Sequence, residues 1–249
     1  MEFDSDAIIS QVEELVEQRQ WPALRDLLLP LPAADIALIL SELPEDRLPL
    51  LYRLLPKELA AEVFVEMEPE QQELLIKSFS DTELKEVLDE LYVDDAVDLI
   101  EEMPATVVKR ILQHTDPETR RSVNEILKYP EDSAGSIMTT EFVDLKKNLT
   151  VADAIKRIRR TGTDKETINY CYVTDPSRHL LGIVSIRTLL LAEEDDVIED
   201  IMDTNVVYAR TMDDKEDVAQ TLNKYGFLAL PVVDAEDRLV GIVTVDDAM

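Results

Sequence analysis

Prolines recur at a nearly constant spacing through the first half of this 249-residue chain, and this spacing constrains the fold more than any other feature. Seven of the nine prolines between residues 30 and 130 stand at positions 32, 44, 56, 69, 104, 117 and 130, mostly 12 or 13 residues apart. The one gap of 35 residues holds two further units without proline, which begin near Ser80 and Tyr92. Proline in the first turn of a helix loses no hydrogen bond, and acidic neighbours favour that end. Each unit therefore predicts a helix of about nine residues and a short turn.

Helices of this length are unstable alone in water and must stack on one another. We therefore predict that residues 1–130 form an all-α superhelical array that resembles armadillo-type solenoids. Hydrophobic residues make up 45% of the chain, which is enough to bury a core, and aromatic residues only 5%, so we expect that core to be aliphatic.

The second half of the chain contains a tandem repeat of another kind. Ser136-Ile137-Met138-Thr139 corresponds to residues 200–203, and the sequence G-I-V-S at 182–185 corresponds to G-I-V-T at 241–244. The hydrophobic pattern of each copy predicts a short strand, an amphipathic helix, two strands joined by a turn and a final helix. We place the first copy at residues 131–198 and the second at residues 199–249.

These two copies resemble a tandem pair of CBS domains. The junction Y-P-x-x-S-A-G-x-x-M-T at residues 129–139, which follows the helical array, is similar to the cytosolic region of MgtE-type magnesium transporters. The resemblance implies a multidomain α plus α/β protein. In that family a transmembrane part follows the second CBS domain through a connecting helix. Since this chain ends on Asp246-Asp247-Ala248-Met249, the first turn of such a helix, we expect more polypeptide downstream.

The net charge of the chain limits the classes of ligand that it can bind. It has 54 acidic and 25 basic residues, a formal net charge of −29, which argues against nucleic acid and anionic lipid and favours cations. Residues 1–130 carry 30 acidic and 12 basic residues, and the remainder 24 and 13, so both halves are anionic. Two unit charges 4 Å apart repel by about 1 kcal/mol in water and about 4 kcal/mol at an effective dielectric constant of 20. Mg²⁺, a small hard cation held by one or two carboxylates, would relieve that repulsion.

Acidic pairs at helical spacing are the candidate ligands. From spacing alone, Asp94 with Asp98, and Glu62 with Glu66, could equally be helix caps or solvated faces. The family resemblance implies Mg²⁺ sites between the helical domain and the CBS pair. The positions that match the family's acidic ligands are Glu62, Asp94, Asp98, Glu216 and Asp247. Gly226 stands where another acidic ligand would be expected, which weakens one site.

The resemblance to CBS domains also implies an adenine-nucleotide site between the two copies. A hydroxyl would bind phosphate, and an Asp three residues later would bind the ribose. The second copy keeps both groups, in Thr244 and Asp247, whereas the first has Ser185 followed by Thr188. The ATP-binding members imply further contacts to the base and phosphates from Tyr170, Arg187, Phe227 and Pro231. Core packing for Tyr170 and Phe227, and a surface ion pair for Arg187, remain alternatives.

Catalysis is not predicted. The motifs GxSxG, GxxxxGK[ST] and GxGxxG are absent, and the single Cys171 and two histidines, His114 and His179, offer no zinc-site spacing. The chain starts without a secretory signal and has no uncharged apolar stretch of the ~20 residues that a membrane span needs.

We therefore predict the cytosolic regulatory region of a magnesium transporter, on the cytoplasmic face of the cell membrane. The resemblance implies Mg²⁺, with ATP as a second ligand, and as partners a second copy bound through the CBS domains and the transmembrane part of the same polypeptide. One alternative is an adenine-nucleotide-sensing CBS module whose helical domain docks a protein. Another is a purely structural adaptor.

Overall fold

The computed structural model describes residues 5–248, so the acidic start at 1–4 and Met249 lie outside it. The chain divides into two compact units. The first contains the residues up to 91 together with 98–120, and the second contains 92–97 together with the residues from 121 onward. Helices α8 (Val93–Glu102) and α10 (Pro117–Ile126) therefore each contribute to both units.

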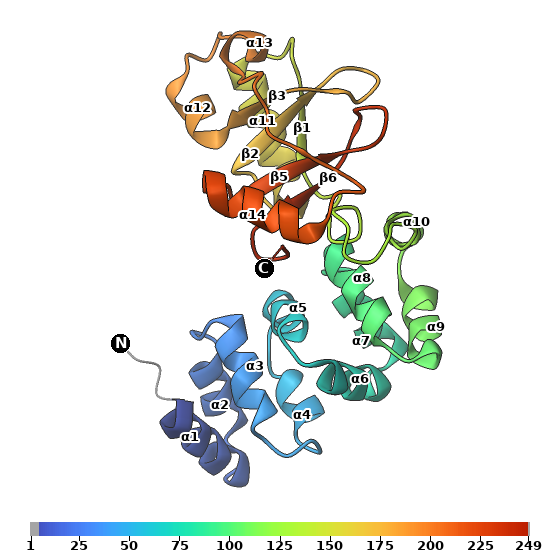
Figure 1. Ribbon diagram of the computed structural model, residues 1–249. Helices are drawn as coiled ribbons and strands as arrows, with labels where there is room; N and C mark the ends of the chain where they lie inside the picture. Colours follow the sequence, from blue (N-terminus) through green and yellow to red (C-terminus); the bar gives the residue numbers. More distant parts are fainter. Residues whose placement is uncertain (1–4, 249) are drawn as a thin grey trace. The chain divides into compact units, whose positions relative to one another are not determined.

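The first unit is an array of short helices (Figure 1). Its helices are α1 (Ser5–Glu17), α2 (Trp21–Leu28), α3 (Ala33–Ser41), α4 (Leu48–Tyr52), α5 (Lys57–Val65), α6 (Pro69–Ser78), α7 (Asp81–Leu88) and α9 (Ala105–His114), with parts of α8 and α10. Helices α3, α5, α7 and α9 contact one another in succession, and α4 and α6 pack beside them. The buried core is mainly Leu, Ile, Val and Ala, with Tyr52, Phe64 and Phe79 as its buried aromatic residues. The predicted all-α array is confirmed.

The prolines begin helices in two ways. Pro69 and Pro117 are the first residues of α6 and α10, whereas Pro32, Pro56 and Pro104 stand one position earlier, as N-caps with extended backbone. Two units differ from the prediction. Pro44 starts a turn in which its carbonyl accepts Arg47 N at 2.8 Å, so α4 is delayed to Leu48, and Pro130 leads into a turn with no helix after it.

The two units predicted without proline use other helix starts. Ser80 is the N-cap of α7, where its Oγ accepts a hydrogen bond from Glu83 N at 3.2 Å. The carboxylate of Glu83 accepts one from Ser80 N at 2.8 Å, which completes a capping box. Helix α8 begins at Val93, directly after Tyr92. In these two units Ser80, and Asp94 with Asp95 in the first turn of α8, thus replace proline as the signal that starts the helix.

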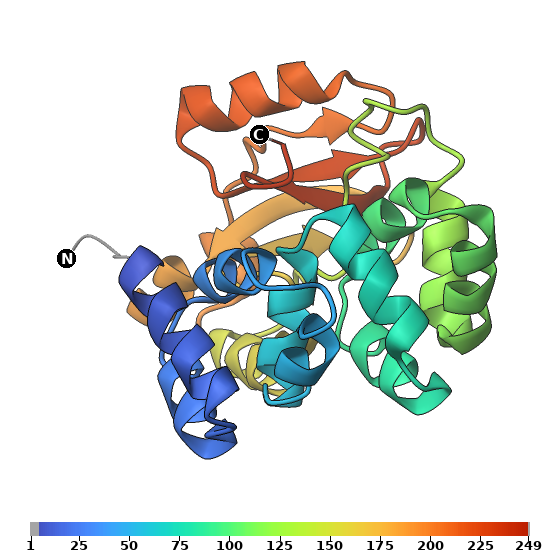
Figure 2. The ribbon, with the colours of Figure 1, turned by 90° about the horizontal axis from the view of Figure 1, so that it is seen from below.

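The second unit contains two three-stranded sheets that lie side by side (Figures 1 and 2). The first is built from β1 (Val143–Lys146), β2 (Tyr170–Thr174) and β3 (Leu180–Ser185), with α11 (Val151–Thr161), α12 (Ile186–Leu191), α13 (Ile198–Ile201) and a short 3₁₀ turn (Gly162–Asp164). The second is built from β4 (Ala209–Arg210), β5 (Ala229–Val233) and β6 (Leu239–Thr244), with α14 (Lys215–Tyr225). In both sheets the first strand runs parallel and the third antiparallel to the middle strand. The repeat of strand, helix and two strands is confirmed, whereas residues 245–248 form turns instead of a helix.

Each copy pairs with the motif that opens the other copy. Ile183 of β3 pairs with Asp203, and Ile242 of β6 pairs with Thr139, through backbone hydrogen bonds of 2.9–3.0 Å. The glycine before each isoleucine permits this approach. A Cβ on Gly241 would lie 2.6 Å from Met138 Sδ and 2.7 Å from Thr139 O, closer than any side-chain carbon can come. The repeated I-M and G-I-V motifs therefore form the joint between the copies.

Candidate functional sites

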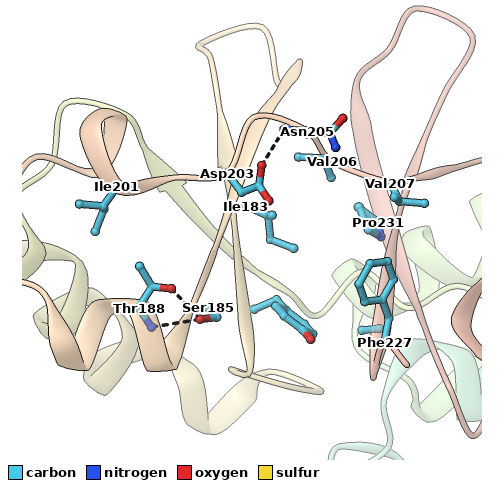
Figure 3. Close-up of a pocket in the computed structure, with 12 residues that line it drawn as sticks. Ile183, Ser185, Thr188, Ile201, Asp203, Asn205, Val206, Val207, Phe227 and Pro231 are labelled. Carbon is cyan, nitrogen blue, oxygen red and sulfur yellow. Dashed lines mark hydrogen bonds between the residues drawn. The ribbon is translucent and has the colours of Figure 1, made fainter. Parts of the chain in front are cut away.

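A cavity of about 250 Å³ lies between the two copies in the second unit (Figure 3). Its walls come from β2, β3 and α12 of the first copy, the segment that precedes β4, and β5 of the second copy. The lining residues are Tyr170, Ile183, Ser185, Thr188, Ile201, Asp203, Asn205, Val206, Val207, Phe227, Ala229 and Pro231. A flat apolar wall with a few polar groups at one side is typical of small-molecule sites.

Two hydroxyl groups form the polar side of the cavity next to α12. Ser185 is the N-cap of this helix, because its Oγ accepts a hydrogen bond from Thr188 N at 3.0 Å. The same Oγ lies 2.9 Å from Thr188 Oγ1. Ser185 is half-buried at the end of β3, opposite Tyr170 in the register of the sheet. The N-cap geometry therefore fixes both hydroxyls at the cavity wall.

Two further polar residues, Asp203 and Asn205, come from the segment that joins the copies. Asp203 is held at the edge of β3 by its backbone pairing with Ile183, and its Oδ1 accepts a hydrogen bond from Asn205 N at 2.8 Å. In Figure 3 Asp203 and Asn205 lie at the end of the cavity away from Ser185 and Phe227. The sequence reasoning missed both residues, although the I-M-D motif that places them was visible.

Aromatic stacking supports the opposite wall. Phe227 lines the cavity and stacks on Tyr225, with ring centroids 5.3 Å apart and planes inclined by 18°. Lys224 Nζ lies 4.9 Å from the centre of the Tyr225 ring. Gly226, which stands between Tyr225 and Phe227 in the sequence, has a φ of +65° and ends α14. This left-handed conformation favours glycine, which explains the residue found where an acidic ligand was expected.

The structure brings together four of the residues predicted for the nucleotide. Tyr170, Ser185, Phe227 and Pro231 all line the cavity. Arg187 is exposed on α12 and is not among the lining residues. Thr244 and Asp247 occupy the equivalent positions of the second copy, away from this cavity.

A tyrosine of the first copy, Tyr172, stands where the second copy has a proline, Pro231. Since Tyr170 and Ala229 hold equivalent register positions, Tyr172 is the counterpart of Pro231. Its ring is fully buried against Ala229 and Ile242 and meets Phe142 edge-on, with centroids 5.8 Å apart. Pro231 thus lines an open cavity, whereas its counterpart Tyr172 is a buried core residue.

An acidic cluster surrounds Thr244 and Asp247. Asp94, in the first turn of α8, is 7% exposed, and its Oδ1 has no hydrogen-bond partner among the described residues. Asp247 is close enough for its charge to raise the pKa of Asp94, and its Oδ2 accepts a short hydrogen bond from Thr244 Oγ1. Two carboxyl groups this close cannot both ionise easily. Ionising both would leave two uncompensated charges in a buried place, which favours a proton or a cation there.

Burial and neighbouring carboxylates both raise the pKa values of the acidic groups in this cluster. Burial is the main cause that raises the pKa of Asp94 well above its usual value, followed by the charges of Asp247, Asp95, Glu166 and Glu141. Burial likewise raises the pKa of Asp247, although the hydrogen bond from Thr244 opposes it. The pKa of Glu166 rises to about 7, first by burial and then by the nearby Asp247 and other acids. The backbone holds Glu166 beside Glu141, with Glu166 N donating to Glu141 O at 2.9 Å.

The other predicted metal ligands are exposed. Glu62 on α5 and Asp98 on α8 are exposed and belong to the first unit. Glu216 is exposed in the first turn of α14, where its N–H donates to Asp214 Oδ1 at 2.8 Å. Within residues 5–248, no group of three or more His, Cys, Asp or Glu side chains is arranged to hold a metal ion. The orphaned Asp94 Oδ1 nevertheless suits a hard cation, whose ligands are oxygens.

Comparison with known proteins identifies the parts of the chain. The MgtE intracellular N domain matches residues 31–132, and the CBS domain matches residues 134–195 and 198–249. Fold and sites together thus define a helical repeat domain followed by a tandem CBS pair. The chain is 38% identical to the magnesium transporter MgtE of Thermus thermophilus and 32% identical to that of Bacillus subtilis, over 96% and 97% of its length. The chain belongs to the MgtE family.

Solved structures agree with this assignment. The cytosolic domain of the Mg²⁺ channel MgtE in complex with ATP is 38% identical and superposes with a TM-score of 0.90, covering 96% of this chain and 98% of that one. The soluble part of a magnesium transporter is 34% identical, with a TM-score of 0.89 and coverage of 98% and 96%. The chain spans 54% of the length of the Thermus and Bacillus transporters. No helix within residues 5–248 is long and apolar enough to cross a membrane.

Proposed function

We propose that this chain is the Mg²⁺-sensing regulatory region of a magnesium transporter, on the cytoplasmic side of the membrane, and that it has no catalytic activity. The single observation that carries the proposal is the buried Asp94 carboxyl group, which has one oxygen without a partner and lies against Asp247. A buried charge of this kind is unfavourable unless a cation or a proton neutralises it. The relatives matched over nearly the whole chain are magnesium transporters, which makes Mg²⁺ the relevant cation.

Mg²⁺ acts in this proposal as the ligand that holds two anionic domains together. Asp94 and Asp247 bind the ion first, and Glu62, Asp98 and Glu216 supply further carboxylates when the helical array and the CBS pair close. The ion shifts this equilibrium only if it binds the closed state more tightly than the open one. The transmembrane part of the same polypeptide would sense that closure.

Thermal unfolding with and without Mg²⁺ tests the metal site. At a concentration 100 times its Kd, a ligand stabilises the folded state by about 2.7 kcal/mol, which corresponds to a rise in Tm of about 5–10 °C for a chain of this size. We expect Asp94→Ala and Asp247→Ala to lose most of this rise, and Asp195→Ala, which alters an exposed loop residue, to keep it. A similar rise in all four proteins would contradict the proposed site.

Solution scattering tests the closure itself. The radius of gyration should fall when millimolar Mg²⁺ is added to the metal-free chain, because closure brings the two anionic domains together. The Asp94→Ala variant should remain at the larger value. An unchanged radius in the wild type would refute the switch and leave the metal site intact.

The cavity favours a second function, binding of an adenine nucleotide. A related cytosolic domain was solved in complex with ATP. Here Tyr170, Phe227 and Pro231 offer a flat apolar wall for a base, and Ser185 and Thr188 offer hydroxyls beside it. Calorimetric titration of ATP without divalent ions tests this function. We expect Phe227→Ala to weaken binding at least tenfold, and absence of binding to the wild type would exclude the site.

We also propose that two copies associate through their CBS domains. Leu190 and Leu191 on α12 are 67% and 76% exposed, which is unusual for adjacent large aliphatic residues. Covering them with a second copy would remove apolar surface from water. Sedimentation should show a dimer that Leu191→Glu dissociates. A monomeric wild type at high concentration would exclude this assembly.

A further inference from the structure

The cavity between the CBS copies has an unusual charge for a site that takes a nucleotide. Of its twelve lining residues, all in the described part of the chain, none is Lys, Arg or His, and Asp203 is the one acidic residue. Nucleoside triphosphates carry several negative charges, which proteins usually meet with cations or free backbone amides. The chain as a whole adds repulsion, since its net charge is −29.

Two of the backbone amides at the start of α12 donate hydrogen bonds within the protein. At the start of α12, Thr188 N donates to Ser185 Oγ at 3.0 Å and Ile186 N donates to Asn169 O at 3.0 Å. The helix is only six residues long, so its dipole adds little. Arg187, on the same helix, is exposed and is not among the lining residues. An exposed ion pair contributes at most about 1 kcal/mol, or about fivefold in affinity.

The groups that do line the cavity suit the uncharged end of a nucleotide. Phe227 and Pro231 form a flat apolar wall, and the Ser185 and Thr188 hydroxyls can bond to sugar hydroxyls or ring nitrogens. The second copy has Asp247 at the position of Thr188. The hydroxyl in the first copy therefore keeps a second carboxylate out of the cavity, whose one acidic residue, Asp203, lies at the other end.

We propose that this cavity recognises the adenosine moiety and leaves the phosphates outside, so that its affinity depends little on their number. The inference rests on the proposed nucleotide site and specifies which part of the nucleotide that site recognises. A site of this kind responds to the total pool of adenine nucleotides and nucleoside. It does not respond to the ratio of ATP to ADP.

Calorimetry on the whole chain in EDTA, with adenosine, AMP, ADP and ATP in separate titrations, tests the inference. We expect the four Kd values to lie within tenfold of one another, or adenosine to bind most tightly. Arg187→Gln should weaken ATP by no more than about fivefold and leave adenosine unchanged, whereas Phe227→Ala should weaken all four equally.

The outcomes separate the two claims. If ATP binds more than tenfold tighter than adenosine, or if Arg187→Gln abolishes ATP binding, the phosphates are recognised and the inference is wrong, although the nucleotide site stands. If none of the four compounds binds, the nucleotide function itself is wrong and the inference falls with it.

Discussion

Replacing Glu166 by glutamine tests the electrostatics of the acidic cluster. Its pKa rises from about 4.5 to about 7 in the folded state, so the folded chain holds a proton more tightly than the unfolded chain between these pH values. The free energy of unfolding must therefore fall as the pH rises through this range. One pKa unit corresponds to about 1.4 kcal/mol, so the part of the shift between pH 5 and 7, reduced for partial solvent access, amounts to about 2 kcal/mol.

Scanning calorimetry in EDTA between pH 5 and 8 measures this effect. We expect Glu166→Gln to match the wild type at pH 5 and to exceed its Tm at pH 8 by about 4–8 °C, since the amide carries no charge at either pH. Glu193→Gln, a change at an exposed loop glutamate, should follow the wild type throughout. The reasoning is refuted if Glu166→Gln gains nothing at pH 8, or gains equally at both pH values.

Three further substitutions test other parts of the molecule. Gly241→Ala should destabilise the CBS pair by about 1–3 kcal/mol, measured by urea unfolding, because the new methyl group would overlap Met138 and backbone; a neutral effect would contradict the close joint. Ser80→Ala should cost about 1 kcal/mol by removing the capping box of α7, and Ser80→Asp, which can still cap the helix, should recover most of it. Tyr225→Ala should weaken nucleotide binding about three- to tenfold by leaving Phe227 unsupported, while Tyr225→Phe keeps the stack and the affinity; equal losses in both variants would show that stacking is not the cause.

The helical array could be predicted from sequence because its start signals are local. Ser80 and the helix-starting prolines act on the turn that follows them, so their spacing is enough to place helices. Pro44 shows the limit of this reasoning. Proline favours a turn as readily as a helix start, and the choice at Pro44 depends on how Leu48 and Leu51 reach the core.

The sites could be predicted only in part, because they depend on contacts between distant residues. Asp94 and Asp247 come together from opposite ends of the second unit, which no spacing reveals, and the family resemblance named them. The same resemblance named Glu216, which lies exposed in the first turn of α14. Glu166 and Asp203 were missed because each reaches its site from a loop whose path is set by backbone pairing with a distant segment, Glu166 with Glu141 and Asp203 with Ile183.

The exchange of opening motifs between the CBS copies has a consequence for how this region can be divided. Thr139 at the start of the first copy completes an edge in the second, and Asp203 at the start of the second completes an edge in the first. Neither half is self-sufficient, so a protease that cuts the connecting loop near residue 195 would leave two fragments clasped together. A gene rearrangement that removed one CBS copy would also remove an edge pairing from the copy that remains.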